Sequence, residues 1–146
     1  MEVIYEVVRI KQEVREIENV KIVRSPDDVA ELGFELIGEE DREVFLVMCL
    51  NTKNHVIAVH KNTVGTLDAS LVNPREVFKT AILNNAQSII VVHNHPSTVP
   101  SPSPQDVEVT ERLQRAGEIL GIELLDHVIV TPIPNKWVSL KEKGYF

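Results

Sequence analysis

Residues 88–120 read SIIVVHNHPSTVPSPSPQDVEVTERLQRAGEIL and combine an apolar run, two histidines, a proline-rich loop and the start of a helix. Four β-branched residues in a row, Ile89 to Val92, predict a strand that is covered on both faces. His93 ends this run and His95 follows two residues later. Residues i and i+2 of an extended chain point to the same side, so we expect the two imidazoles to converge on one point.

The loop after the histidines ends in a helix start, Ser103-Pro104-Gln105-Asp106. Serine at the N-cap, proline at the first helical position and an acid three residues after the cap are typical of a helix N-terminus. Capping alone is therefore a sufficient reason for both Ser103 and Asp106. The inward face of this helix is expected to be an apolar stripe with two small residues beside it: Val109, Leu113, Ala116 and Leu120, with Thr110 and Gly117.

Asp106 lies at the start of that inward stripe, because residues i, i+3 and i+7 share one face of a helix. An inward aspartate needs a partner, since an isolated buried carboxylate is very costly. His93 and His95, at the end of the neighbouring strand, could supply that partner through a metal ion. Two histidines, one aspartate and an open fourth position are typical of a catalytic zinc site.

The spacing His93-x-His95-Pro96, followed after the loop by Ser103-x-x-Asp106, matches the JAMM motif of the JAB/MPN metalloprotease family. With residues 43–54, 70–78 and 121–127 included, the chain resembles the RadC-like branch of that family over about residues 25–140. The resemblance implies an α/β, cytidine-deaminase-like architecture and a Zn²⁺ ion, with a bound water, held by His93, His95 and Asp106. It also implies an upstream glutamate as general base and Ser103 as a hydrogen-bond donor to the oxyanion.

The chain departs from the pattern of the families it resembles at three points. Thr98-Val99 stand where the RadC-like branch usually carries Gly-Asp, which changes the loop and the mouth of the site but leaves the ligands in place. Asn94 stands where deubiquitinating relatives have Ser or Thr. Full-length members also carry a helical N-terminal domain, thought of as nucleic-acid-binding, which this chain is too short to contain.

Length and composition are those of one globular domain, residues 1–146, with 43% hydrophobic and 25% charged residues. A net charge of −7 disfavours direct binding to nucleic acid, which depends on neutralising phosphates. Cys49 is the only cysteine, so no intrachain disulfide is expected, and its apolar neighbours indicate a buried small hydrophobe. No stretch resembles a signal peptide or a membrane span, and we therefore expect a cytoplasmic protein without membrane association.

The rest of the chain predicts a mixed β-sheet flanked by about three helices, an α/β or α+β fold. The expected elements are, in order, a strand over 2–11, a second strand or hairpin arm over 12–23, a helix from Ser25 to Gly38, strands over 44–50 and 55–60 with an extension over 61–67, a helix from Asn73 to Asn85, the two elements described above, and strands over 127–131 and 137–140. The expected core sides of the first two helices are Val29, Leu32, Leu36 and Ile37, and Val77, Phe78, Ala81 and Ile82.

The general base is expected to be Glu43, because it lies at the strand start that the resemblance aligns with the glutamate of the family. A zinc hydrolase needs a carboxylate within reach of the metal-bound water. Glu40 and Glu39 are the alternatives, although the run from Glu39 to Arg42 is otherwise expected to face solvent. The ordinary interpretation of Glu43 itself is a surface acid on an edge strand.

The remaining histidines are interpreted as structural. His55 and His60 are expected at the surface, at the ends of a hairpin strand. Asp126-His127 is expected to be a turn acid beside an edge histidine, and the alternative is a partner that orients a metal-bound histidine.

The predicted function is zinc-dependent hydrolysis of an amide or isopeptide bond, the chemistry of a metallopeptidase acting on a protein or peptide. The main alternative is a metal-binding regulatory or interaction module of DNA repair or mobile elements that has no peptidase activity. A two-histidine, one-carboxylate iron enzyme is a further alternative, and a nucleic-acid enzyme is disfavoured by the acidic balance. The absence of a C-x-x-C pair excludes a zinc deaminase.

Overall fold

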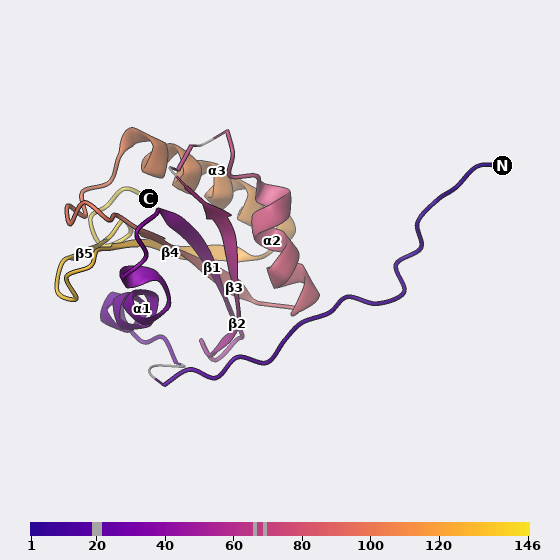
Figure 1. The fold of residues 1–146 in the computed structure, drawn as a ribbon, viewed down its shortest axis with the longest axis horizontal. Coiled ribbons are helices and arrows are strands. Elements are labelled where there is room, and N and C mark those ends of the chain that lie inside the picture. The colour runs from indigo at the N-terminus through magenta and orange to yellow at the C-terminus, as the bar shows by residue number, and fades with distance from the viewer. Residues whose placement is uncertain (19–21, 66, 69) are drawn as a thin grey trace.

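The computed structural model describes residues 1–18, 22–65, 67–68 and 70–146. Five strands form one mixed sheet in the order β2-β1-β3-β4-β5, with helices on both faces (Figure 1). The elements are α1 (Pro26–Gly33), the π-helical turn η1 (Phe34–Gly38), β1 (Val44–Leu50), β2 (Val56–Val64), α2 (Pro74–Leu83), β3 (Ser88–Asn94), α3 (Pro104–Leu120), β4 (Glu123–Val130) and β5 (Trp137–Ser139). This arrangement confirms the predicted mixed sheet with three helices.

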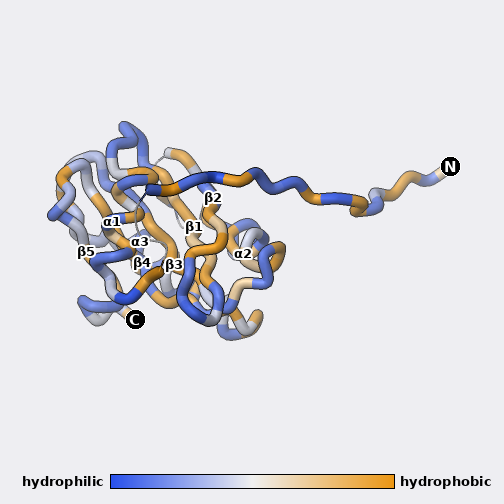
Figure 2. Tube along the Cα trace, turned by 90° about the horizontal axis from the view of Figure 1, so that it is seen from below, coloured by the Kyte–Doolittle hydropathy of each residue, from blue (hydrophilic) through white to orange (hydrophobic). Residues whose placement is uncertain are grey.

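The sheet is built around two wholly buried strands, β1 and β3, which pair antiparallel to each other. Their continuous apolar runs fit central strands that are covered on both faces, and Figure 2 shows the hydrophobic colour along them. β3 also pairs in parallel with β4, and α3 is the crossover between them. Parallel strands need such a crossover. As a result, the end of β3 and the start of α3 belong to one connection.

The sheet separates two apolar layers. One layer lies under α2 and α3 and is centred on Phe45, Phe78 and Leu113. The other lies under α1 and η1 and includes Leu32, Ile37 and Met48. Figure 1 shows α1 on one side of the sheet and α2 with α3 on the other. Cys49 is buried in the first layer, as expected of a small hydrophobe, and burial raises the pKa of its thiol to about 12.

The N-terminal prediction is wrong. Residues 2–11 form no strand: their apolar side chains are exposed, and the segment runs away from the sheet (Figure 1). A strand forms only where its backbone finds a ladder partner, and this segment has none among the described residues. Over 12–23, the described part holds only one bridge, between Ile22 and His55, while 19–21 lie outside the described residues.

Two predicted core residues are exposed. Ile82 is 58% exposed because it falls beside, and not on, the face that Val77, Phe78 and Ala81 bury. Leu120, 47% exposed, ends α3 where the chain reverses at Gly121. A Cβ on Gly117 would collide with the Ile122 carbonyl oxygen, so the returning backbone occupies that side of the last turn.

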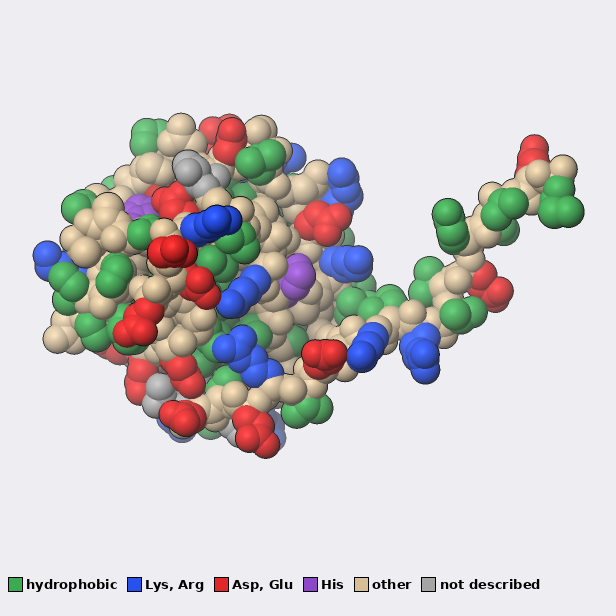
Figure 3. Space-filling model, in the orientation of Figure 1, with side chains coloured by type: hydrophobic (Ala, Val, Ile, Leu, Met, Phe, Trp, Pro, Cys, Tyr) green, Lys and Arg blue, Asp and Glu red, His purple; other side chains and the backbone are tan. Residues whose placement is uncertain are grey.

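Charged side chains of both signs are mixed on the surface shown in Figure 3. On that face Lys and Arg lie next to Asp and Glu. Among the described residues, no helix is long and apolar enough to cross a membrane.

Candidate metal centre

The end of β3 delivers two histidines to one place. His93 is the sixth residue of the seven-residue strand, and its side chain is only 2% exposed. The N–H of His95 donates to the Val130 carbonyl, 2.8 Å away, so β4 holds the chain extended past the strand end. The two rings lie 4.9 Å apart, centre to centre, and nearly perpendicular. The predicted convergence of the imidazoles is therefore present in the fold.

Asp106 enters the same place from the first turn of α3. Ser103 and Asp106 form a capping box: the Ser103 Oγ accepts from the Asp106 N–H at 3.1 Å, and Asp106 Oδ2 accepts from the Ser103 N–H at 2.7 Å. The Asp106 side chain is fully buried, with Oδ1 3.2 Å from His93 Nδ1 and Oδ2 3.3 Å from His95 Nε2. The carboxylate thus lies against both histidines.

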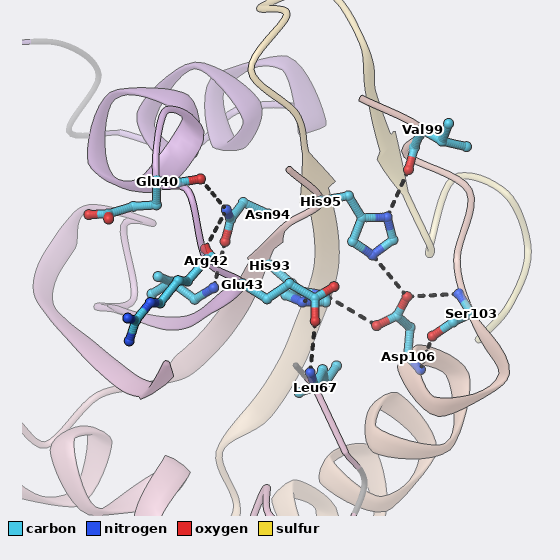
Figure 4. A network of polar contacts seen from close by, with 11 residues as sticks. Glu40, Arg42, Glu43, Leu67, His93, Asn94, His95, Val99, Ser103 and Asp106 are labelled. Carbon is cyan, nitrogen blue, oxygen red and sulfur yellow. Dashed lines mark hydrogen bonds and ion pairs between the residues drawn. The ribbon is translucent and has the colours of Figure 1, made fainter. Parts of the chain in front are cut away.

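Glu43 approaches His93 from the start of β1 (Figure 4). Its Oε1 is 3.6 Å from His93 Nε2, and its Oε2 accepts a 2.9 Å hydrogen bond from the Leu67 N–H. The side chain is 25% exposed, so it lies at the mouth of the centre. Glu39 is exposed and Glu40 pairs with Lys61 near the surface. Of the three candidate glutamates, the structure brings only Glu43 to the histidines.

Asn94 fixes the segment that carries Glu43. It is fully buried; its Oδ1 accepts from the Val44 N–H at 2.6 Å, and its Nδ2 donates to the carbonyls of Arg42 at 2.9 Å and Glu40 at 3.3 Å. These bonds enclose Glu43 on both sides in the sequence (Figure 4). The amide between the two histidines therefore ties the β3 end to the backbone of the glutamate.

The loop between the histidines and α3 orients His95. The Nδ1 of His95 lies 2.8 Å from the Val99 carbonyl oxygen. A carbonyl oxygen can only accept a hydrogen bond, so Nδ1 carries a proton. Thr98, at φ 68°, adopts the left-handed conformation that glycine favours. Threonine therefore occupies a backbone position that favours glycine, the residue that the resemblance led us to expect there.

The electrostatics of the centre are those of a carboxylate shared between imidazoles. Burial raises the pKa of Asp106, but its contacts with His93, His95 and the Ser103 N–H outweigh burial and hold the pKa well below its usual range. Burial lowers the pKa of His95, yet Asp106 and the Val99 carbonyl raise it to a net value above the usual one. Both shifts show that the pocket favours positive charge beside Asp106.

Several buried ligand atoms in this centre make no hydrogen bond with any described residue. They are both ring nitrogens of His93, Oδ1 of Asp106 and Nε2 of His127. Buried polar atoms are usually paired, and exceptions call for a reason such as an ion. With Nδ1 protonated, a neutral His95 also turns a lone pair toward Asp106 Oδ2 at 3.3 Å, a contact that a cation between them would make favourable. The donor set therefore fits a metal ion.

Two groups of three residues place one ligand atom each within 4.8 Å of one another: Glu43, His93 and His95, and His93, Asp106 and His127. The predicted trio of His93, His95 and Asp106 is thus divided between two overlapping groups. His93 belongs to both groups. Asp106 links the two histidines, because one of its oxygens lies near His93 and the other near His95.

His127 is the residue that the sequence interpretation misplaced. Asp126-His127 is not an edge turn: β4 begins at Glu123, both side chains are buried, and β5 covers the outer edge of β4. Asp126 accepts hydrogen bonds from the His127 N–H, the Lys141 N–H and the Ser139 Oγ. The apolar run Val128 to Val130 was the signal for a buried strand, and it extends back through His127. By contrast, His60 is exposed and His55 partly exposed, close to expectation.

Comparison with known proteins places the chain among described relatives. Residues 23–145 match the RadC-like JAB domain. The UPF0758 proteins of Desulforudis audaxviator and Desulfitobacterium hafniense are 54% and 51% identical over 85% and 84% of this chain. That of Methanosarcina barkeri is 44% identical over 84%. The matched region is 53% of each of these three, so the chain spans about half the length of the curated relatives it matches.

The domain match covers most of the chain and includes the histidines, Asp106 and Glu43. It agrees with the mixed sheet and with the motif spacing on which the resemblance rests. The chain therefore belongs to the family of RadC-like JAB domains.

Proposed function

We propose that this chain is a zinc-dependent hydrolase of amide or isopeptide bonds, with His93, His95 and Asp106 holding the ion. The observation that carries the proposal is the position of Asp106, whose two buried oxygens lie 3.2 Å and 3.3 Å from nitrogens of the two histidines. Nitrogen and carboxylate ligands suit zinc, and a set of three leaves a position for substrate or water. This donor set supports both the choice of zinc and a hydrolytic reaction.

When bound, a zinc ion would lower the pKa of a coordinated water toward neutrality and polarise the scissile carbonyl. Glu43 would act as the general base, accepting a proton from the attacking water and returning it to the leaving amine. Its Oε2 is held by the Leu67 N–H, which leaves Oε1, at 3.6 Å from His93, facing the centre. The carboxylate is thus oriented before any substrate arrives.

Ser103 would donate a hydrogen bond to the developing oxyanion. Its Oγ accepts from the Asp106 N–H in the capping box, and a hydroxyl that accepts one bond can still donate another. Removing an oxyanion donor of this kind costs about 2.7–4 kcal/mol of transition-state stabilisation. The same hydroxyl would therefore serve the helix and the reaction.

The substrate class that we propose is a protein or peptide. The net charge of −7 makes direct DNA binding by this domain unfavourable, and the face in Figure 3 shows basic side chains interspersed with acidic ones. Submicromolar, salt-sensitive binding to duplex DNA would count against a peptide substrate.

Metal content tests the ligand set. Protein purified without chelator should contain about one zinc per chain by elemental analysis, the number that one site of this kind holds. Asp106→Asn should lose most of it, because a neutral amide is a poor ligand, whereas Asp27→Asn in the exposed first turn of α1 should keep it. Full zinc occupancy in Asp106→Asn would refute the assignment.

Activity on a peptide and isopeptide library tests the chemistry. Glu43→Gln should keep its zinc but hydrolyse about 10²–10⁴-fold more slowly, the range that general-base catalysis supplies. Glu39→Gln and Glu40→Gln are the matched controls and should retain wild-type rates. If zinc-loaded wild type cleaves nothing in the library, the regulatory-module alternative replaces the hydrolase.

A further inference from the structure

His127 carries a buried nitrogen that the fold does not otherwise use. The residue is 0% exposed inside β4, and its Nε2 makes no hydrogen bond with any residue that the structure describes. The ring lies 5.9 Å from Phe45, edge to face. A histidine kept for packing alone would leave this nitrogen unpaired at a cost, since a buried polar atom without a partner is unfavourable.

The hydrogen bonds around Thr110 assign the tautomer of His127. The Thr110 Oγ lies 2.7 Å from the Asp106 carbonyl oxygen and 2.7 Å from His127 Nδ1. The carbonyl can only accept, so the single hydroxyl hydrogen of Thr110 goes to it. The Nδ1 of His127 must then donate to Thr110. In the neutral ring this leaves Nε2 without a proton and with a free lone pair.

His127 lies beside the metal centre. His93, Asp106 and His127 each place one ligand atom within 4.8 Å of the other two. Since Nδ1 is bonded to Thr110, Nε2 is the atom that His127 has to offer. All three residues are buried, whereas Glu43 stands at the partly exposed mouth.

We propose that His127 is a third imidazole ligand of the metal, which it reaches through Nε2 from the buried side of the centre. The inference rests on the proposed metal site and adds a residue outside its motif. Thr110 fixes the tautomer in the form that metals bind, as partners of metal-bound histidines do. The ion would then be held by His93, His95, Asp106 and His127, and Glu43 would face the side left for water. That water would be the fifth ligand of the ion, and zinc can expand to five ligands during a reaction.

The test removes Nε2 while keeping the hydrogen bond to Thr110. In His127→Asn, the amide nitrogen can occupy roughly the place of Nδ1 and donate to Thr110, but nothing replaces Nε2. His127→Phe is a second variant: it removes both ring nitrogens but keeps an aromatic ring that can pack against Phe45. His60→Asn, on the exposed face of β2, is the matched control. Each 146-residue protein is stripped with chelator and reloaded with Zn²⁺ or Co²⁺.

Three measurements are made on each protein. Competition with a chromophoric chelator gives the metal affinity, X-ray absorption at the zinc edge counts the imidazoles bound to the ion, and thermal melts of the metal-free forms report folding. We expect three imidazoles in wild type and in His60→Asn, and two in His127→Asn and His127→Phe. We expect the affinity of both His127 variants to fall by more than about 100-fold, beyond the 10–100-fold cost of losing an outer hydrogen-bond partner.

The outcomes separate this inference from the proposed function. Two imidazoles in wild type, or unchanged affinity in a folded His127 variant, would overturn the ligand role while leaving the metal site intact. A weaker affinity without a lost imidazole would also overturn it, because His127 would then act only through a neighbour. If wild type binds no metal, both the inference and the proposed function fail.

Discussion

Replacing Asn94 with aspartate should destabilise the fold strongly at neutral pH. The fully buried amide accepts from the Val44 N–H and donates to the partly buried carbonyls of Arg42 and Glu40. An aspartate has nearly the same shape and keeps the acceptor for Val44. Its second oxygen, however, would face two carbonyl oxygens that need donors. The substitution therefore changes hydrogen bonding at almost constant volume.

The magnitude follows from the two states open to the new side chain. Ionised, it leaves two partly buried carbonyls without their donor, at about 1–3 kcal/mol each. Protonated, it restores one donor, but keeping a carboxyl neutral at pH 7 costs about 4 kcal/mol relative to its ordinary pKa, and one hydrogen bond of about 1 kcal/mol is still lost. Asn94→Asp should thus lose about 3–5 kcal/mol at pH 7. At pH 4.5 protonation is nearly free, and the loss should shrink to about 2 kcal/mol.

Urea unfolding of metal-free protein at both pH values measures this difference. Asn135→Asp, at an exposed position in the turn before β5, adds the same charge and should stay within about 0.5 kcal/mol of wild type. The reasoning is refuted if Asn94→Asp matches its control at pH 7. It is also refuted if its destabilisation grows as the pH falls, because the sign requires the neutral form to be the better tolerated one.

Three further predictions concern stability. Burial lowers the pKa of His127 to about 3, so the folded state keeps it neutral while the unfolded state protonates below about pH 6.5. Metal-free wild type should lose about 2.3 kcal/mol between pH 6.5 and 4.5 from this residue alone, and urea titrations that show the same slope in His127→Asn would contradict it. Thr98→Gly should stabilise the folded state by about 1 kcal/mol, because glycine adopts the positive φ of this position without strain. An unchanged or lower urea midpoint would show that Thr98 is not strained. Burial raises the pKa of Asp126, so Asp126→Asn should be at least as stable as wild type at pH 7. Asp126→Ala, by contrast, should lose about 3 kcal/mol of stability, because it removes the acceptor of three hydrogen bonds. Equal melting temperatures for the two variants would show that those bonds do not stabilise the fold.

The sequence predicted the elements whose cause is local. Continuous apolar runs predicted β1 and β3, and proline after a capping residue predicted the starts of all three helices. Residues 2–11 fail for a reason the local pattern does not contain. Their β-branched residues suit a strand, but a strand also needs a partner edge, and in the structure β1 pairs with β2 and β3 instead. Pairing depends on segments distant in the chain.

The site was predictable to the extent that its residues follow the motif. Spacing alone brought His93, His95 and Asp106 together, and the resemblance selected Glu43. His127 escaped because its partner Thr110 is 17 residues away, and because an acid before a histidine reads as a turn. Asp126 is buried instead with Ser139, 13 residues further on, across the β4 to β5 pair. Neither contact leaves a local signature.

The capping box shows why a motif aspartate can be interpreted in two ways without contradiction. Capping uses Asp106 Oδ2, which accepts the Ser103 N–H, and leaves Oδ1 without a hydrogen bond to any described residue. That second oxygen lies 3.2 Å from His93 Nδ1 in a fully buried position. A cap requires only one oxygen, and a metal ligand requires only one. The helix start and the proposed metal centre therefore share one carboxylate: Oδ2 accepts the capping bond and also lies 3.3 Å from His95 Nε2, while Oδ1 is left for His93.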